Sequence, residues 1–137
     1  MGKNLEISIK QIPAKRQRYR TLGDYFYNKN ILSILVNQEL GEKAFCAVAL
    51  HEFVESTLCR FRGIPEVDIT NWDIGYEKTR EREFAPCGCK HYEEPGDDPH
   101  APYWREHQLA TTIERMYIHD LGQNWGDYEQ RLAEEED

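Results

Sequence analysis

Residues 42–62 read EKAFCAVALHEFVESTLCRFR, the longest stretch of the chain without glycine or proline. Apolar residues recur in it every three to four positions, which predicts an amphipathic α-helix over about residues 40–62. Gly63, followed by Pro65, is a typical stop signal for this helix. At about 100° per residue, its apolar side is expected to carry Ala47, Leu50, Val54, Leu58 and Phe61.

The residues before this helix predict a small sheet. Leu5, Ile7 and Ile9 alternate with polar residues, which is the period of a half-buried strand. Two short apolar runs, 25–27 and 31–36, flank an Asn-Lys-Asn turn and predict a β-hairpin. We expect these strands, within about residues 4–37, to form an antiparallel sheet.

The residues after the long helix complete the expected fold. Helical patterns predict three further helices over about residues 68–82, 102–121 and 124–135, and a proline-rich loop is expected at 84–101. Strands followed by helices are typical of an α+β fold, here a small antiparallel sheet at the N-terminus packed against three to four helices. A chain of 137 residues is expected to form one domain, residues 1–137.

Three ionisable residues interrupt the apolar pattern of the 40–62 helix. His51 falls inside the apolar sector, and Glu55 follows one turn later, close to its edge. Burying such groups without partners is unfavourable, and a bound metal ion is a common way to make them tolerable. Glu52 projects about a quarter turn away, where a general base would stand beside the metal.

The expected 102–121 helix repeats this pattern. Its apolar side is expected to carry Tyr103, Ala110, Ile113, Tyr117 and Leu121. His107 and Glu114 lie within or beside that side, and Glu106 lies near it. We therefore predict a metal ion held between the two helices. The expected ligands are His51, Glu55 and His107, with Glu114 or Glu106 as a fourth ligand or as a carboxylate that orients a ligand histidine.

Such a ligand set indicates a metal-dependent hydrolase. Three protein ligands leave a position for water, whose pKa a divalent cation lowers, and Glu52 would accept its proton. Zinc is the first expectation for two imidazoles and a carboxylate, and iron or manganese is compatible with the same ligands.

Two other interpretations of these residues stay open. In the first, His51 and Glu55 form only a hydrogen-bonded pair at the edge of the core. In the second, the helical carboxylates hold Mg²⁺ for nucleotide hydrolysis; the candidate residues are Glu52, Glu55, Glu106 and Glu114. The absence of a glycine-rich phosphate loop from the sequence weakens the second interpretation.

The proline-rich loop contains a second group of candidate ligands. Cys87, Cys89 and His91 offer three soft ligands within five residues, although a structural zinc needs a fourth ligand and usually has wider cysteine spacing. The alternative is a loop with exposed thiols. The acidic run that follows lacks the spacing of a calcium loop, so Asp97 or Asp98 is expected to start a turn or a helix.

Composition limits the partners of the chain. A formal net charge of −8 argues against general nucleic-acid binding, which requires clustered basic residues. The sequence contains no stretch of about 20 apolar residues, the length that a membrane span requires, and the first residues do not resemble a signal peptide. We expect a cytoplasmic protein with reduced cysteines, whose partner is a peptide or another protein.

The chain resembles a group of short bacteriophage and prophage proteins. Four groups of residues carry the resemblance: Gln17-Arg18-Tyr19 with Gly23-Asp24-Tyr25, the segment 49–55, Gly96-Asp97-Asp98-Pro99 with Ala101-Pro102-Tyr103, and Glu106-His107 with Ile113-Glu114-Arg115. The resemblance spans most of the chain. It implies a phage-encoded protein in the host cytoplasm, and an accessory protein that binds a host protein without catalysis is an alternative to the hydrolase.

A more distant resemblance is to the minimal core of zincin metallopeptidases. In that family a hairpin precedes a helix that bears the metal ligands, and a strand edge aligns a peptide over the metal. The resemblance implies that His51 is a ligand, that Glu52 is the base, and that Glu106 or His107 supplies a third ligand from a later helix. Glu55 departs from the pattern, since zincins normally have a second histidine there.

Overall fold

The computed structural model describes residues 4–80, 92 and 94–136. Within these residues the chain forms a sheet of three strands, four α-helices and two short 3-10 helices. In chain order they are β1 (Glu6–Ile12), η1 (Ala14–Arg16), β2 (Gly23–Asn28), β3 (Ile31–Asn37), α1 (Glu42–Phe61), α2 (Glu66–Lys78), η2 (Pro95–Asp97), α3 (Trp104–Asp120) and α4 (Trp125–Glu136). The predicted α+β class, with an N-terminal sheet packed against helices, is confirmed.

The sheet has the strand order β1-β3-β2. Strands β2 and β3 form the predicted antiparallel hairpin, whose turn places Lys29 at a positive φ of 57°. Strand β1 pairs parallel to β3, so the sheet is mixed, and the expectation that it would be wholly antiparallel was wrong. The most apolar strand, β3, takes the central position, and three of its side chains are fully buried: Leu32, Ile34 and Val36.

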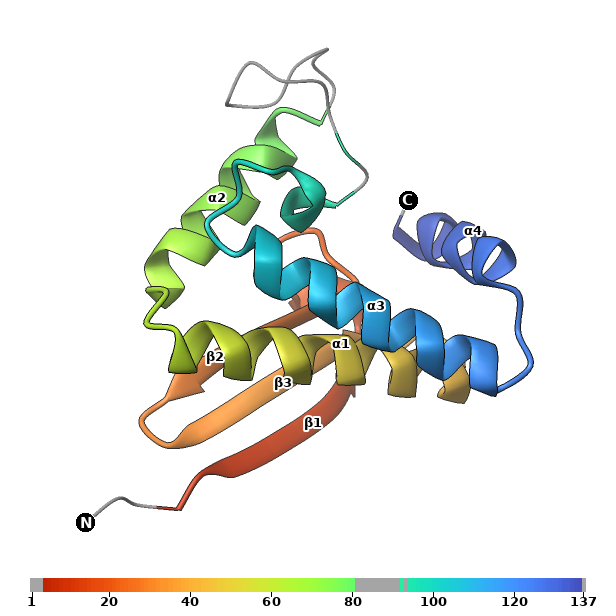
Figure 1. The fold of residues 1–137 in the computed structure, drawn as a ribbon, viewed down its shortest axis with the longest axis horizontal. Helices are drawn as coiled ribbons and strands as arrows, with labels where there is room; N and C mark the ends of the chain where they lie inside the picture. The colour runs from red at the N-terminus through yellow and green to blue at the C-terminus, as the bar shows by residue number, and fades with distance from the viewer. Residues whose placement is uncertain (1–3, 81–91, 93, 137) are drawn as a thin grey trace.

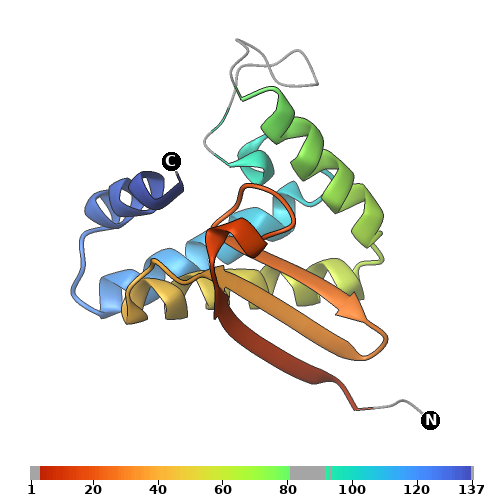
Figure 2. The ribbon, with the colours of Figure 1, turned by 180° about the vertical axis from the view of Figure 1, so that it is seen from behind.

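Helices α1 and α3 lie on one face of this sheet. Figures 1 and 2, which view the molecule from opposite sides, show α1 and α3 on the same face of the sheet. Helix α1 packs on β2 and β3, and α3 packs along α1. Ile118 of α3 and Tyr128 of α4 join the apolar core that fills the space above β3. None of the helices in the described ranges has an apolar stretch of the length that a bilayer crossing needs.

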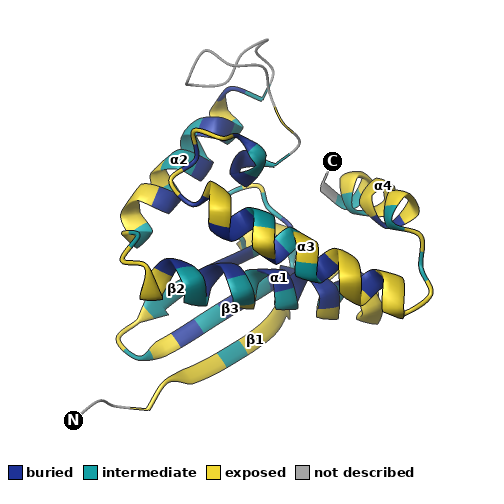
Figure 3. Ribbon diagram, viewed as in Figure 1, coloured by how far each residue is buried: buried dark blue, intermediate teal, exposed yellow. Residues whose placement is uncertain are grey.

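The buried side of α1 differs from the expected one. It carries Ala44, Ala47, Val48, Ala49, His51, Glu55, Ser56 and Cys59. Leu50, Val54 and Leu58 are only half-buried, and Phe61 is 77 % exposed, so the expected burial of Phe61 was wrong. The reason is tertiary, because the sheet and α3 pack on the sector that contains His51 and Glu55. Figure 3 shows that α1 alternates between buried and exposed stretches. The ionisable residues therefore lie in the middle of the buried side.

The other helices begin and end close to the predicted residues, except that α2 begins and ends earlier, and begins directly after a proline. Helix α2 begins at Glu66, directly after Pro65, and ends at Lys78, whereas the expected helix was 68–82. Pro65 fits this position because proline lacks the N–H that a helix start leaves unpaired. Helices α3 and α4 lie within two residues of the predicted ranges. Of the expected loop 84–101, residues 94–101 contain η2, and residues 84–91 and 93 lie outside the described residues.

Candidate metal site

Three of the predicted ligands meet where α1 crosses α3. The His51 Nε2 atom lies 3.1 Å from Glu55 Oε2 and 3.2 Å from His107 Nδ1. The third side of the triangle, from His107 Nδ1 to Glu55 Oε2, measures 2.8 Å. All three residues are buried, and these three side chains form a group that could hold a metal ion.

The triangle has the size that a divalent cation requires. In tetrahedral or octahedral geometry, ligand atoms about 2.1 Å from a metal lie about 3.0 to 3.4 Å from each other. Two of the observed separations fall within this range, and the third, 2.8 Å, lies about 0.2 Å below it. The side chains could therefore take up a cation with small adjustments. Two imidazoles and one carboxylate suit zinc, iron or manganese.

The ring of His51 is positioned by a carboxylate that contacts the nitrogen on the side away from the triangle. Its Nδ1 atom lies 2.8 Å from Glu114 Oε1, and the other Glu114 oxygen accepts a 2.5 Å hydrogen bond from the hydroxyl of Tyr128 on α4. In the neutral tautomer in which Nδ1 donates to Glu114, Nε2 would turn its lone pair toward the other two ligand atoms. Glu114 therefore occupies the orienting role that the sequence left open for it.

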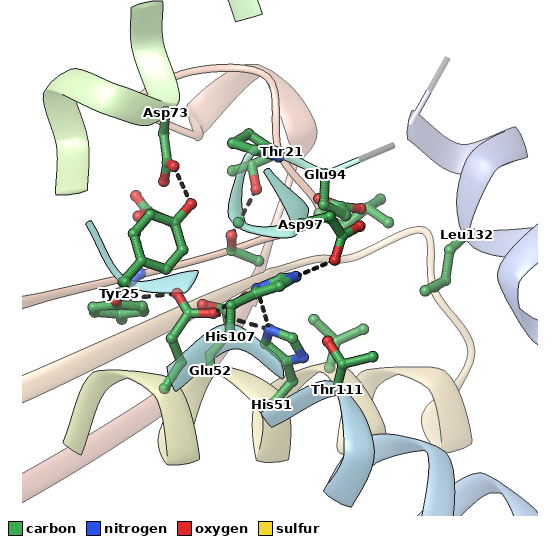
Figure 4. Close-up of a pocket in the computed structure, with 18 of the residues that line it drawn as sticks. Thr21, Tyr25, His51, Glu52, Asp73, Glu94, Asp97, His107, Thr111 and Leu132 are labelled. Carbon is green, nitrogen blue, oxygen red and sulfur yellow. Dashed lines mark hydrogen bonds and ion pairs between the residues drawn. The ribbon is translucent and has the colours of Figure 1, made fainter. Parts of the chain in front are cut away.

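His107 is oriented in the same way by a residue that the sequence did not single out as functional. Its Nε2 atom lies 3.0 Å from Asp97 Oδ1, at the end of η2 (Figure 4). Gly96 lies directly against this ring, since a Cβ atom placed there would come within 2.5 Å of His107 Cγ and 2.6 Å of Nδ1. The glycine thus allows η2 to approach the imidazole, and Asp97 fixes which nitrogen faces the site.

Glu55 is anchored by the sheet. Its Oε1 atom accepts a 3.1 Å hydrogen bond from the hydroxyl of Tyr25 on β2, which leaves Oε2 to face the two histidines. Each of the three candidate ligands is therefore positioned from a different element: His51 by α3, His107 by η2 and Glu55 by β2. Supports of this kind are typical of metal sites, where they fix ligand orientation.

Electrostatics in the cluster are set by burial and by these contacts. Burial alone would lower the pKa of His51 and of His107, but hydrogen bonds to carboxylates outweigh it, and the pKa of His107 rises to about 10. Burial alone would raise the pKa of Glu55, but both histidines reverse this and lower the pKa to about 2. Without a cation, protons hold the two imidazoles and the carboxylate together, and a cation must displace protons to bind.

Glu106, the other candidate for a fourth ligand, lies outside this group. Its Oε2 atom forms a 2.6 Å ion pair with Arg62 Nη1, at the C-terminal end of α1. Glu106 immediately precedes His107 on α3, so it projects about 100° away from it around the helix. Glu106 is therefore not part of the group of three candidate ligands, and its buried charge is neutralised by Arg62.

Glu52 lies beside the triangle and lines the same cavity. It is half-buried, and within the described residues no hydrogen bond to its carboxylate is formed. Burial raises its pKa well above the ordinary value, and the neighbouring Glu55 raises it further. Gly23 of β2 makes room for it, since a Cβ atom there would come within 2.8 Å of Glu52 Oε1. Glu52 is therefore a carboxylate close to the candidate ligands whose pKa lies above the ordinary value.

A cavity of about 560 Å³ surrounds these side chains (Figure 4). Carboxylates outnumber guanidinium groups in its lining. The acidic residues are Asp24, Glu52, Glu55, Glu66, Asp73, Glu77, Glu94, Asp97, Glu114 and Glu129, and the arginines are Arg18, Arg20, Arg80 and Arg115. This excess of negative charge attracts cations and opposes the entry of polyphosphates.

Asp73 of α2 forms a second buried polar group in the cavity wall. Its carboxylate accepts hydrogen bonds from the hydroxyls of Tyr19 and Tyr103. Burial raises the pKa of Asp73 to about 7 even though both hydrogen bonds lower it, and the charges of Glu55 and Asp24 add to the increase. The sequence did not indicate this residue, which looks like an ordinary acidic position of an amphipathic helix.

The edge of β2 beside the cavity is closed by side chains. Glu66 accepts a hydrogen bond from the Tyr27 N–H at 3.2 Å, and Asp24 accepts one from the Tyr25 N–H at 2.8 Å. The carbonyl of Tyr25 accepts from Arg18, and that of Gly23 accepts from the Thr21 hydroxyl at 2.7 Å. These four outward backbone groups of the edge strand are thus used within the chain.

Segments that are far apart in the sequence converge on this site. Residues 23–25, 49–55, 96–97, 106–107 and 113–114, which carry the resemblance to phage proteins, all contribute side chains at or next to it. No model of a known protein family matches this chain, and no curated protein or solved structure matches it either. The phage resemblance and the zincin resemblance therefore stay predictions.

Tyr25, Asp97 and Gly96 were not predicted from the sequence as residues of the site. Tyr25 was expected only as part of a strand, and Asp97 only as the start of a turn or helix. One signal was available for the last two, since a glycine next to an acidic residue in a proline-rich segment is typical of a chain that approaches another closely. Cys87, Cys89 and His91, the second group of candidate ligands, lie outside the described residues.

Proposed function

We propose that this protein is a metal-dependent hydrolase in which His51, Glu55 and His107 bind one divalent cation, zinc before iron or manganese. The observation that carries the proposal is the triangle of ligand atoms with sides of 2.8 to 3.2 Å. Each ligand side chain is also hydrogen-bonded, at its other polar atom, to a residue outside the triangle. A bound cation of this type supplies polarisation of a water molecule and of the bond to be broken.

Glu52 is the proposed general base. It stands on the same helix as two of the ligands, lines the cavity, and is not tied to another described residue by a hydrogen bond. A pKa raised above the ordinary carboxylate value, with burial as its main cause, brings a glutamate closer to the range in which it accepts and returns protons at neutral pH. Gly23 provides the space that this side chain occupies.

The closed edge of β2 bears on the substrate. In a zincin-like arrangement an extended peptide would pair with the strand beside the metal, but here Glu66, Asp24, Arg18 and Thr21 occupy the backbone groups of that strand. We therefore favour a compact substrate that fits the acidic cavity over a long peptide aligned on β2. An uncharged or cationic group suits this lining best.

Metal binding is the first test. Protein purified without an affinity tag, stripped with chelator and then titrated with Zn²⁺, Fe²⁺ or Mn²⁺, is expected to bind one equivalent by calorimetry and elemental analysis. His51→Ala and His107→Ala are expected to lose at least about 100-fold in affinity, while His119→Ala, an exposed histidine of α3, keeps it. Less than about one-tenth equivalent of every metal after reconstitution contradicts the proposal.

Catalysis is tested separately from binding. Glu52→Gln is expected to bind metal like the wild type and to lose hydrolysis of whichever substrate a panel of esters, amides, peptides and nucleotides reveals, by about 100-fold or more. Glu134→Gln, on the exposed end of α4, is the matched control. Equal activity of Glu52→Gln and wild type on that substrate removes Glu52 from the reaction.

One observation favours a structural role as a second candidate. Every side chain of the triangle already has at least two hydrogen-bonding partners within the protein, so the cluster could serve as a polar core of an accessory protein that binds a host protein. This candidate predicts that His51→Ala unfolds the protein while Glu52→Gln leaves every biological readout unchanged. Mg²⁺-dependent nucleotide hydrolysis has less support, because Glu106 and Glu114 are engaged by Arg62 and His51.

A further inference from the structure

Strand β1 presents an open edge on the opposite side of the sheet from β2. Glu6 donates its N–H to Asn30, and Ile12 accepts from Gln38, so the even-numbered residues of β1 direct their backbone groups toward β3. Backbone direction alternates along a strand, so residues 5, 7, 9 and 11 direct theirs outward. In the described part of the chain no hydrogen bond reaches these outward groups, in contrast to the closed edge of β2.

The side chains of β1 make this edge apolar on one face. Leu5, Ile7 and Ile9 are 39 %, 44 % and 45 % exposed, and Figure 3 shows most of β1 coloured as exposed. Ile7 and Ile9 stand opposite Leu32 and Ile34 in the parallel register, so they lie on the helix-covered face of the sheet. Helix α1 packs over β2 and β3, and it leaves β1 beyond its cover.

We propose that two copies of this chain associate through the free edges of β1, in an antiparallel register centred on Ser8, to form a continuous six-stranded sheet. This register pairs Glu6 with Lys10 of the partner and Ile7 with Ile9 of the partner, and each pairing occurs twice because of the two-fold symmetry. The isoleucine pairs extend the apolar layer of Leu32 and Ile34, and the ion pairs lie on the other face.

The charges of β1 select this register over its neighbours. The outward backbone groups belong to odd-numbered residues, so only registers that pair odd with odd residues form hydrogen bonds across the edge. Centring on Glu6 or on Lys10 would place like charges opposite each other, which is unfavourable. Centring on Ile7 or Ile9 leaves Glu6 or Lys10 opposite Ser8. Only the Ser8 register satisfies both charges, and serine is small enough for the close approach at the symmetry axis.

Sedimentation equilibrium of the full chain over a wide concentration range tests the proposal. At low salt the wild type is expected to show a monomer–dimer equilibrium. Glu6→Lys and Lys10→Glu each convert two attractive pairs into repulsive ones and are expected to weaken dimerisation about tenfold or more. The double variant Glu6→Lys/Lys10→Glu restores opposite charges in this register and is expected to return within about threefold of the wild type.

Each outcome decides the proposal. Rescue by the double exchange supports it, because this register places the two exchanged positions opposite each other. A wild type that stays monomeric at every concentration overturns it, whether or not β1 binds an extended segment of another protein. A dimer that is indifferent to the single exchanges, or weakened further by the double exchange, also overturns it. Both positions are exposed, so thermal unfolding of the variants is expected to match the wild type and serves as the folding control.

Discussion

The two edges of the sheet differ in how their polar groups are satisfied. Along β2, backbone donors and acceptors are bound by Glu66, Asp24, Arg18 and Thr21, and the candidate metal site lies next to them. Along β1, the corresponding groups face outward beside exposed isoleucines. Edge strands are reactive toward other strands unless they are covered. The contrast indicates that one edge is closed to form a pocket and the other is available for association.

The same contrast extends to the interior. On the buried side of α1, His51 and Glu55 have polar partners, and Glu55 contacts Tyr25 of β2, whereas the neighbouring alanines and Val48 belong to the apolar core. Buried polar groups are tolerated on the β2 side because each one has several partners. The chain thus uses its hydrogen-bonding groups for a site on one side and uses apolar packing for stability in the middle.

The largest effect expected on the β2 side is a pH dependence that originates in Asp73. Its folded-state pKa of about 7 exceeds the ordinary value of 3.8, so the folded state holds a proton more tightly than the unfolded state, and its contribution to stability falls as pH rises from about 4 to 7. About three pKa units at about 1.4 kcal/mol each give a loss of at most about 4 kcal/mol. Asp73→Asn is expected to remove this pH-dependent contribution to stability.

Urea unfolding of wild type and Asp73→Asn at pH 4.5 and 7.5 measures this term. The unfolding free energy of the variant, relative to wild type, is expected to increase with pH, because the other ionisable side chains around Asp73, among them Tyr19, Tyr103 and Glu55, are common to both proteins. Asp68→Asn, an exposed position of the same helix, is the control. Parallel pH profiles for Asp73→Asn and wild type would show that the buried carboxyl does not carry this linkage.

Gly96→Ala is expected to disrupt the candidate metal site without replacing a ligand. The new methyl group would overlap His107, so the ring must turn away from Asp97 and from the other ligand atoms, and metal affinity is expected to fall about 10- to 100-fold. Gly75→Ala on α2, where a methyl group meets nothing within 4 Å, is the matched control. Calorimetric titration with Zn²⁺ measures both. Unchanged affinity in Gly96→Ala would mean that the position of the His107 ring does not matter for binding.

Glu66→Ala would remove one of the side chains that cover the β2 edge, and so tests the contrast between the two edges of the sheet. It leaves the Tyr27 N–H without its acceptor, which is expected to cost about 1–2 kcal/mol of unfolding free energy. Asp68→Ala removes a carboxylate from the same first turn of α2 and controls for the helix-terminal charge. Chemical denaturation of the two variants gives the difference, and equal losses would show that closure of the β2 edge contributes nothing beyond that charge.

The smallest expected effect is on stability, and it compares an apolar residue of β3 with one of β1. Ile34→Val, in the fully buried centre of β3, is expected to cost about 1 kcal/mol, whereas Ile7→Val on β1 is expected to change stability by less than about 0.5 kcal/mol. Unfolding is measured at protein concentrations at which the wild type is monomeric. A similar loss at both positions would show that Ile7 is packed in the monomer and would leave less apolar surface for association.

The sequence predicted a large part of the candidate site because the helical period is a local property. His51 and Glu55, one turn apart, had to lie on the same side of α1, and His107 had to share a side of α3 with Glu114. It did not predict Asp97 or Tyr25, because their positions depend on how η2 and β2 approach the helices. The ion pair of Glu106 could not be predicted for a similar reason, since its partner Arg62 lies 44 positions away in the chain.

The amino-acid sequence by itself determined the long helix, the hairpin and the α+β order, because hydrophobic periodicity and turn residues act over a few neighbouring positions. Only the tertiary structure decided which side of α1 is buried, that β3 inserts between β1 and β2, and that one edge of the sheet is closed while the other is open. Those features arise from contacts between distant segments, and their free energies depend on the packing of the whole chain.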